Sequence, residues 1–558
     1  MKSRRPETRS NELRIRRRPL LGGAAALGAG WLIGCDGETP GLDAGRLPDA
    51  GPRPDAGASL LPYAPRDRTY ETFEHGVASG DPLPDAVILW TRITVGPEGT
   101  PDPGSIDVTY EVASDPSIAT VVTSGTFSTD ASREFTDKVD VDGLSAATTY
   151  YYRFTYGSVT SPIGRTRTAP SGPTDRLRFG VCSCSSLGHG FFHGYAKLAA
   201  RADLDAVLHL GDYIYEYGSG GYGGARLYEP MHEIVSLDDY RARYSQYRRE
   251  PELFEAHRQH PFIAVWDDHE TANNSYHDGA ENHDPATEGS WTDRLAAAAQ
   301  AYREWMPIRE QTEPLRIWRS LVYGDLVELI MLDTRIWGRD LQVEDSTDPR
   351  LTDPTRGLLG ADQEAFLLDR LETSTSQWKL LGQQVMMAPL TGFTNTDQWD
   401  GYPVARARLL EAIRTDAVED IVVLTGDIHS SWCFDLPEDP AAPAYDPSTG
   451  AGSLAVEIVV PGISSPGFPD FVAEGIQDDL LTWNPHLRWS NLVRRGYAVL
   501  DVTRERAHVD WYLTGDPEDP MDESEEHGAS YAVEAGTAHF EEADGEAPPP
   551  GTPPPLAP

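Results

Sequence analysis

The chain has 558 residues, of which 39% are hydrophobic and 24% charged, so it is long enough to fold into more than one domain. Its formal net charge is −41 at pH 7. This charge argues against nucleic acid as a partner, because phosphate backbones are bound by clustered Lys and Arg side chains. A secreted protein or a cation-binding protein fits the acidic composition.

The first residues are typical of an export signal. Arginines at positions 16–18 precede an apolar stretch, residues 20–34, that is too short to span a bilayer. The paired arginines resemble a twin-arginine signal, and residues 32–35 resemble a lipoprotein cleavage box. For residues 1–35 we therefore expect export by the twin-arginine machinery and lipid attachment at Cys35, with the protein in the periplasm or at the cell surface. An uncleaved anchor or a plain cleaved signal is the alternative.

Two segments of different character follow the signal. Residues 36–62 are dominated by Asp, Gly, Pro, Ala and Arg, which predicts a disordered linker. Residues 63–172 contain short alternating runs separated by turn residues, with no helical period. The pattern predicts an antiparallel all-β domain of immunoglobulin or fibronectin type. Its runs include VILWTRI, SIDVTYEVA, VVTSGTFS and TTYYYRFTY.

From Leu177 the pattern changes to apolar, strand-like runs that end in polar residues. Helical stretches at 236–259 and 292–307 lie between some of these runs. Strands that alternate with helices predict a layered α/β domain, which we place at residues 173–515. Residues 516–558 are acidic and then proline-rich, and we expect this tail to be mostly disordered.

Chemically competent side chains follow six of the strand-like runs. The carboxyl ends of parallel strands open into the functional crevice of such a domain, although a single Gly-Asp pair is equally typical of a turn. Thiolate and phenolate donors suit a trivalent or soft transition ion, whereas carboxylate and amide oxygens suit Ca²⁺. The side chains are Cys184; Asp212 and Tyr215; Asp267, Asp268, His269, Asn273 and Asn274; Asp333 and Arg335; Gln383 and Gln384; and Asp427 and His429. This mixture favours a site for two metals.

Seven motifs, ordered along the chain, resemble those of PhoD-type alkaline phosphatases, a branch of the calcineurin-like metallophosphoesterases. The resemblance covers residues 73–512. It implies an α/β/β/α metallophosphoesterase sandwich that follows the N-terminal β-domain. The motifs are GVASGDPLPDAVILWTR, SCSS, GDYIYEY, WDDHETANN, LDTR, QQVMMAP and TGDIHSSW.

The resemblance also implies a role for each matching residue. One group is similar to the ligands of a ferric ion: Cys184, Asp212, Tyr215 and His429. Asp212 would also bridge to a second cation, and a Tyr215 phenolate would give the protein a visible colour. A second group is similar to calcium ligands: Asp268, Asp427 and Gln384, with Asn273 and Asn274 as the less favoured amides. Other divalent ions are alternatives at this second site.

The expected catalytic side chains are His269, Arg335 and Asp268. The resemblance implies that His269 acts as a general acid or phosphate contact and that Arg335 pairs with phosphate. The implied reaction is hydrolysis of a phosphate ester by a metal-bound hydroxide. Phosphodiesterase or phospholipase D-like activity is the alternative, followed by a non-catalytic surface lipoprotein. We expect a monomer.

Cys182 alternates with Cys184 along the same run and should therefore point to the opposite face as a buried thiol. A disulfide between Cys182 and Cys433 is the alternative in an oxidising compartment.

Overall fold

The computed structural model describes residues 71–97, 99–224, 226–392 and 394–558. The expected export signal, the linker at 36–62 and the lipidation site Cys35 lie outside the described residues. Within the described ranges, no helix is both long and apolar enough to cross a membrane.

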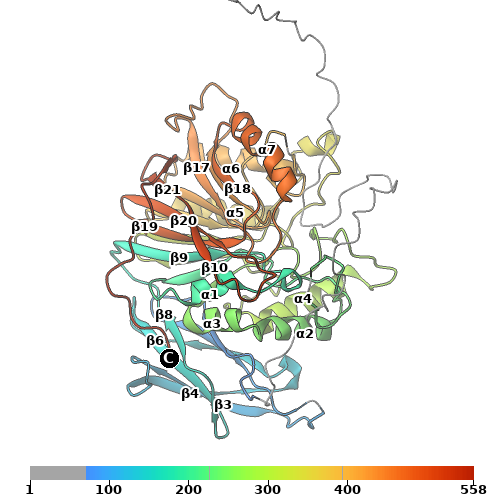
Figure 1. The fold of residues 1–558 in the computed structure, drawn as a ribbon, viewed down its shortest axis with the longest axis vertical. Coiled ribbons are helices and arrows are strands. Elements are labelled where there is room, and N and C mark those ends of the chain that lie inside the picture. The colour runs from blue at the N-terminus through green and yellow to red at the C-terminus, as the bar shows by residue number, and fades with distance from the viewer. Residues whose placement is uncertain (1–70, 98, 225, 393) are drawn as a thin grey trace, which may run out of the picture.

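Two stacked mixed sheets form the centre of the molecule (Figure 1). The strands of the first sheet, in spatial order, are β22 (Phe540–Glu542), β21 (Glu525–Glu534), β20 (Arg506–Thr514), β19 (Gly496–Thr503), β9 (Arg176–Cys182), β10 (Ala206–His209), β11 (Pro261–Ala264), β1 (Val77–Gly80), β2 (Val87–Arg92) and β5 (Thr136–Val141). Those of the second are β12 (Arg319–Tyr323), β13 (Val327–Met331), β14 (Trp378–Gly382), β15 (Ile421–Thr425), β17 (Ser453–Val459), β16 (Ser431–Pro437) and β18 (Leu487–Asn491).

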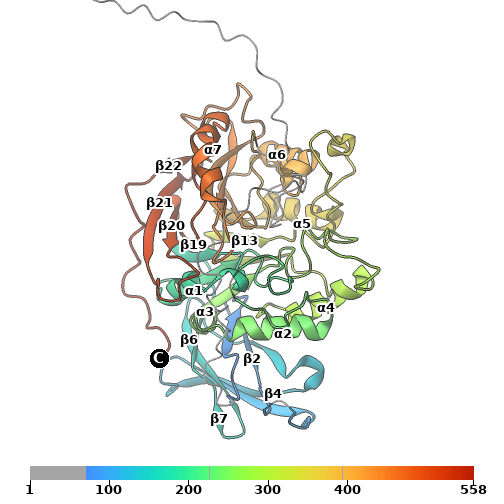
Figure 2. The same ribbon diagram turned by 45° about the vertical axis from the view of Figure 1, so that its right-hand side comes forward.

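Helices cover the outer faces of both sheets (Figure 2). On the side of the first sheet lie α1 (His193–Ala199), α2 (Leu237–Arg248), α3 (Pro251–Gln259) and α4 (Trp291–Trp305), and on the side of the second lie α5 (Gly360–Thr373), α6 (Pro403–Thr415) and α7 (Asp470–Trp483). The expected helical stretch at 236–259 is two helices, because Pro251 cannot continue a helix and instead begins α3.

The second sheet is apolar on both faces, as a sheet between two layers must be. In β14, Leu380 belongs to the core between the sheets, and Leu381 belongs to the core beneath α5 and α6. Val422 and Val423 divide in the same way in β15. This period of two places helix, sheet, sheet and helix in successive layers, and the predicted α/β/β/α fold is confirmed.

The N-terminal β-region shares a strand pairing with the first central sheet. A five-stranded sheet packs against β1, β2 and β5 through a common apolar core, and its strands are β3 (Ile106–Ala113), β4 (Val121–Thr129), β6 (Thr149–Tyr156), β7 (Val159–Thr160) and β8 (Gly164–Arg167). However, β1 pairs in parallel with β11, with Ser79 opposite Pro261, so one layer of the sandwich continues the first central sheet. The pairing removes an exposed strand edge, which explains why the sandwich does not stand alone. Its immunoglobulin or fibronectin type stays a prediction.

The expectation of a mostly disordered tail at 516–558 is wrong. Strand β21 pairs with β20 along its length, and β22 adds to β21. The expectation rested on the acidic composition, but apolar residues alternate along β21. Tyr531 and Val533 belong to the central core, whereas Glu534 is exposed. Burial of that apolar face outweighs the charge of the segment.

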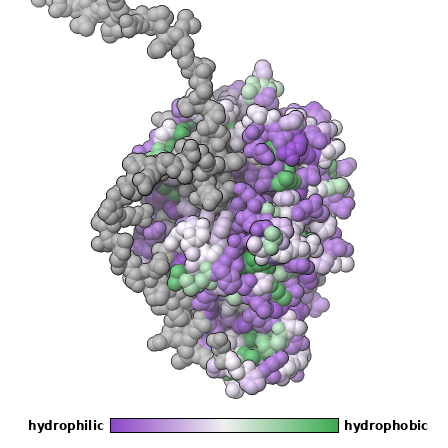
Figure 3. Space-filling model, turned by 90° about the vertical axis from the view of Figure 1, so that its right-hand side faces the viewer, coloured by the Kyte–Doolittle hydropathy of each residue, from purple (hydrophilic) through white to green (hydrophobic). Residues whose placement is uncertain are grey.

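The face shown in Figure 3 is mainly hydrophilic, and its apolar residues form small separate patches. Scattered apolar residues of this kind are normal on a folded surface and do not mark a docking site.

Candidate metal centre

Strand register brings the sequence motifs to one edge of the paired sheets. His209 at the end of β10 lies opposite Cys182 of β9 and Ala264 of β11. In the second sheet, Gly382 of β14 lies opposite Leu424 of β15. The loops that follow these strands therefore leave the sheets side by side, as expected for the carboxyl ends of parallel strands.

Three groups of possible metal ligands meet at this edge. In each group the ligand atoms lie within 4.8 Å of one another, and every member is buried. The groups are Cys184, Asp212 and His429; Asp212, Asp268 and His269; and Asp267, Asp268 and Asp427. Since Asp212 and Asp268 each belong to two groups, the three groups form one continuous centre.

Tyr215 joins the group of Cys184, Asp212 and His429. Its hydroxyl donates to Asp212 Oδ2 at 3.0 Å and lies 3.1 Å from His429 Nε2. Ser465 Oγ, which belongs to none of the sequence motifs, lies 2.6 Å from the same hydroxyl. Burial and the charge of Asp212 raise the pKa of the Cys184 thiol well above its usual value. A thiolate at this position therefore requires a cation beside it.

The backbone at this centre is held in an uncommon conformation. Cys184, Asp212, Asp427 and His429 have φ values of 57°, 56°, 63° and 55°, in the left-handed region that non-glycine residues rarely adopt. Each such residue costs about 1 kcal/mol or more, and strain of this kind gathers at functional sites. Gly211, just before Asp212, leaves the space needed here, because a Cβ atom on it would lie 2.5 Å from Asp267 Cβ.

Arg335 is fully buried among carboxylates. Its guanidinium donates to Asp267 Oδ1, to Asp427 Oδ1 at 2.7 Å and to Asp397 Oδ2 at 2.7 Å. The expected pairing of Arg335 with phosphate therefore gains no support, because each of its three nitrogens donates to a carboxylate. Its position instead offsets the repulsion between the aspartates of different loops.

Two residues of this neighbourhood were missed by the sequence analysis. Asp397 accepts from both Arg335 and Arg339, and Gln398 Nε2 donates to Asp427 Oδ2 at 3.0 Å. They lie in a loop that has no metal-ligand motif of its own, and only the chain path brings the loop to the centre.

The candidate amide side chains differ in their contacts. Gln384 Oε1 accepts from the backbone N–H and hydroxyl of Thr334, and its Nε2 donates to Leu332 O at 2.8 Å. Its amide therefore braces the loop after β13, and its expected role as a calcium ligand gains no support. Asn273 and Asn274 are buried, and within the described chain their Oδ1 atoms have no hydrogen-bond partner.

Asp333 and Gln383 also have structural contacts. Asp333 Oδ1 accepts from the backbone N–H groups of Arg335 and Ile336, which closes the turn after β13. Gln383 Nε2 donates to Thr425 Oγ1 and Val385 O.

His269 is oriented by a carboxylate that the sequence analysis did not single out. Its Nδ1 lies 2.7 Å from Glu216 Oε2, and both side chains are fully buried. Glu216 also accepts from Asn273 N at 2.7 Å and Asn282 Nδ2 at 3.0 Å. Burial lowers the pKa of His269, but the charges of Glu216 and Asp268 outweigh burial and hold this pKa well above its usual value. A ring nitrogen of His269 lies within 4.8 Å of carboxylate oxygens of Asp212 and Asp268, and Nε2 has no hydrogen-bond partner among the described residues.

Glu270 ties the first two aspartate motifs together. Its carboxylate accepts from the backbone N–H groups of Asp212, Tyr213 and Asp267 at 2.8–3.0 Å. Burial and the neighbouring charge of Asp212 raise its pKa to about 8. The DDHE motif contains Glu270, but nothing in the sequence showed that its side chain would turn back onto the backbone.

The donor set fits bound cations. Asp267 Oδ2, Asp268 Oδ1 and Asn273 Oδ1 are buried oxygens that accept no hydrogen bond from the described residues. Buried polar atoms are nearly always paired, so the open oxygens of Asp267 and Asp268, which lie in one ligand group with Asp427, indicate a ligand that is not part of the chain. Carboxylate and amide oxygens suit a hard ion, and the thiol, phenol and imidazole suit a transition ion. Cys182 and Cys433 are free buried thiols, so the alternative of a disulfide between them gains no support.

Comparisons with known proteins show the family of the chain. Residues 179–511 match the family model of the PhoD-like phosphatases, and residues 59–170 match the model of the N-terminal domain of these phosphatases. Alkaline phosphatase D of Bacillus subtilis (strain 168) is 37% identical over 477 residues, which cover 82% of this chain and 79% of that protein.

Solved structures are similar as well. A structure of PhoD shares 33% identity with a TM-score of 0.79, over 86% of this chain and 94% of that one. A purple acid phosphatase from yellow lupin has a TM-score of 0.53 at 11% identity, over 82% and 73% of the two chains, and so shares the fold alone. With both family models matched and a curated relative aligned over most of its length, the chain belongs to the PhoD-like phosphatase family, whose members hydrolyse phosphoric ester bonds.

Proposed function

We propose that the protein is an exported alkaline phosphatase that hydrolyses phosphate esters at a centre of one iron and one calcium ion. The observation that carries the proposal is the continuous centre in which Asp212 and Asp268 link three groups of buried ligand atoms. Such a centre suits two cations a few ångströms apart, the arrangement that clamps the attacking and leaving oxygens in phosphoryl transfer.

The two cations would be held by different donors. The ferric ion would be held by Cys184, Tyr215 and His429 together with Asp212, which would also face the second ion. The calcium ion would be held by Asp268, Asp427 and an amide, for which the open Oδ1 atoms favour Asn273 or Asn274 over Gln384. Bound cations would supply Lewis-acid chemistry by lowering the pKa of water and by offsetting charge on the phosphoryl oxygens.

His269 is the proposed proton donor to the leaving-group oxygen. The Nδ1–H of its protonated ring donates to Glu216, so Nε2 carries the second proton on the side of Asp212 and Asp268. The charges of Glu216 and Asp268 raise its pKa, which favours the protonated ring that a general acid requires. Arg335 would act indirectly, by holding Asp267 and Asp427 in place.

A substrate panel tests the proposed reaction. Hydrolysis of p-nitrophenyl phosphate and of its bis-ester would be measured with calcium added and with calcium chelated, alongside the iron and calcium content of the purified protein. We expect metal-dependent hydrolysis, with the monoester preferred. Faster turnover of the bis-ester would identify the phosphodiesterase alternative. Absence of both metals together with absence of both activities would exclude the proposal.

We propose further that the mature protein is lipid-anchored through Cys35 after twin-arginine export. The support is the sequence alone, namely the arginines at 16–18 and the box at 32–35. Cells fed a radiolabelled lipid precursor should label the wild-type protein and not the Cys35→Ala variant. Equal release of both forms into the soluble periplasmic fraction would contradict the anchor.

A further inference from the structure

Residues 543–558 cross from the catalytic sheets to the N-terminal β-region. The segment leaves β22 and runs along the side of the molecule to the neighbourhood of β6 (Figures 1 and 2). Ala547 and Ala557 are buried, with exposed fractions of 4% and 6%, while most residues between them are exposed. The segment is therefore attached near two points and lies over the surface between them.

The two attachment points belong to different parts of the fold. Ala547 N donates to Asp510 Oδ2 on β20 at 3.1 Å. Ala557 exchanges two hydrogen bonds with the side chain of Gln259 at the end of α3, at 2.8 and 3.1 Å. Ala557 also packs in a small apolar cluster with Ala113, Ile118 and Tyr151 of the N-terminal region. The Tyr151 hydroxyl donates to Pro555 O at 2.5 Å.

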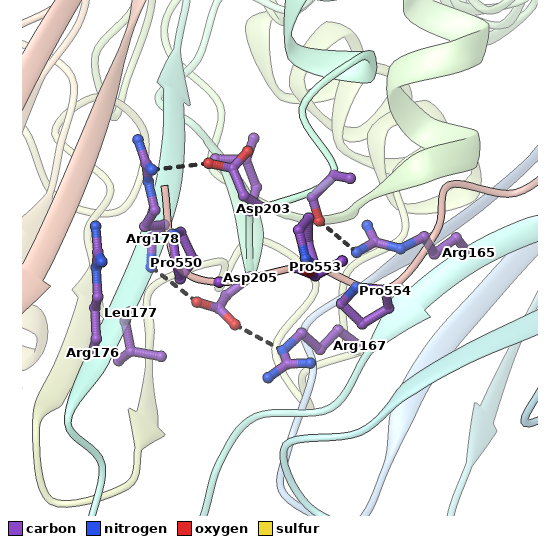
Figure 4. A pocket seen from close by; sticks show the side chains of 14 residues that line it. Arg165, Arg167, Arg176, Leu177, Arg178, Asp203, Asp205, Pro550, Pro553 and Pro554 are labelled. Carbon is purple, nitrogen blue, oxygen red and sulfur yellow. Dashed lines mark hydrogen bonds and ion pairs between the residues drawn. The ribbon is translucent and has the colours of Figure 1, made fainter. Parts of the chain in front are cut away.

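Between these points the segment covers a cavity of about 260 Å³ (Figure 4). Four arginines, Arg165, Arg167, Arg176 and Arg178, line it together with residues 550–554. Two of them pair with carboxylates beside the cavity, Arg167 with Asp205 at 2.7 Å and Arg178 with Asp203 at 2.9 Å. Beside the cavity, Arg176 donates to Pro548 O, and Arg258 joins the region by donating to Ile163 O and Pro558 O at 3.0 and 2.8 Å.

The hydrogen-bonding groups of the segment complement those of the surface beneath it. Proline has no N–H group, so a proline-rich segment presents mainly carbonyl acceptors, and here guanidinium and phenol groups supply donors. The N–H groups of Ala547 and Ala557 meet the two side-chain oxygens, of Asp510 and Gln259. Proline also restricts the unbound chain to extended conformations, which reduces the entropy lost on docking.

We propose that residues 547–558 of this segment are an intramolecular clasp that fixes the N-terminal β-region to the catalytic layers. The clasp connects β20, α3 and β6, three elements that are distant in sequence and lie in separate parts of the fold. It acts on the register and rigidity of the junction between the two regions and leaves the metal centre, at the opposite ends of β9 and β10, untouched.

Removal of the clasp from the full chain tests the proposal. A chain ending at Glu546 should have a Tm lower by about 2–5 °C, since a few hydrogen bonds and one small apolar contact are lost. Amide hydrogen exchange should accelerate in β6 and in the residues around Ile163, and stay unchanged in the central strand β15. A synthetic peptide of residues 546–558, added at about millimolar concentration to replace the tether, should restore the Tm and the protection of β6.

Point variants keep the test independent of chain length. Ala557→Asp places a charge in the apolar cluster and should reproduce the effects of truncation, whereas Pro549→Ala, at an exposed position between the attachment points, should not. If the truncated chain failed to fold, Ala557→Asp would supply the same measurement. Unchanged exchange in β6, or an equal increase in β6 and β15, would overturn the clasp.

Discussion

At the scale of single residues, the centre depends on side chains whose direction is set by unusual backbone. Cys184 and Cys182 show this best. Both are buried thiols on the same run, yet Cys182 ends a regular strand and faces the core, whereas the left-handed φ of Cys184 turns its sulfur toward Asp212 and His429. Alternation along the strand predicted that the two side chains point to opposite faces. The structure shows in addition that the backbone leaves the strand conformation between them.

Cys184→Ala should lower the iron content of the purified protein by about tenfold or more, because one of the four proposed donors is lost. The visible absorption expected from a Tyr215 phenolate should weaken in parallel. Iron analysis and an absorption spectrum measure both effects. Cys182→Ala is the matched control, which should keep its iron and lose only some stability. Full iron in the Cys184 variant would remove this residue from the site.

Glu216→Gln should lower kcat/KM by about 10–100-fold, because His269 loses the carboxylate that fixes its ring and its protonation. The alkaline limb of the pH–rate profile should move to lower pH, a change that general loss of stability would not cause. Asp435→Asn breaks another buried carboxylate–histidine pair, with His539 at 2.7 Å, and should leave the profile unchanged. Identical pH profiles for wild type and Glu216→Gln would contradict the role of Glu216.

At the scale of elements, loops at the strand ends are held by buried carboxylates that accept backbone N–H groups. Glu270 does this for the first two motif loops, and Glu457 of β17 does it for the loop after β14, where it accepts from Met387 N at 2.8 Å and Ala388 N at 2.7 Å. Backbone groups in loops lack a ladder partner, and these carboxylates supply one within the protein. Holding the loops in this way buries the carboxylates of Glu270 and Glu457, and burial raises the pKa of each.

Glu457 therefore predicts a pH dependence of stability. Burial raises its pKa from 4.5 to about 7 in the folded protein. Between these values the folded state binds more protons than the unfolded state, so stability falls as pH rises through this window. The full difference, about 3 kcal/mol, is lost above pH 7. Glu457→Gln removes the titration, so its Tm should vary less than that of the wild type between pH 5 and 8. Parallel Tm curves for the two proteins would contradict this assignment.

At the scale of the whole molecule, the chain is strongly acidic, and several of its carboxylates lie close together at the centre. The net charge is −41, and Asp212, Asp267, Asp268 and Asp427 come together with Arg335 as their neighbouring guanidinium. Like charges at this distance destabilise the fold unless cations offset them. Stability of the whole chain should therefore be linked to metal binding.

Chelation of divalent ions should lower the Tm of the whole protein, and added calcium should restore it, by about 2.7 kcal/mol of stability when free calcium reaches about 100 times its Kd. Sodium chloride at equal ionic strength is the control for general screening of the −41 charge. A Tm that rises equally with either salt would show that screening, and not a specific site, stabilises the protein.

The sequence by itself determined the layered fold, the order of the motifs and the identity of most residues at the centre. It could do so because alternating apolar residues specify buried strands, and because residues that follow parallel strands meet at one edge. Tertiary structure alone decided which of the candidate side chains turn inward. Gln384 and Arg335 matched the expected chemistry, yet neighbouring loops engage their polar groups, while Asp397, Glu216 and Glu270 carried no signal that they would reach the centre. Tertiary structure also decided that residues 516–558 are ordered. Their composition opposes folding, and their partners are the edge of β20 and the side-chain donors along the path of residues 547–558.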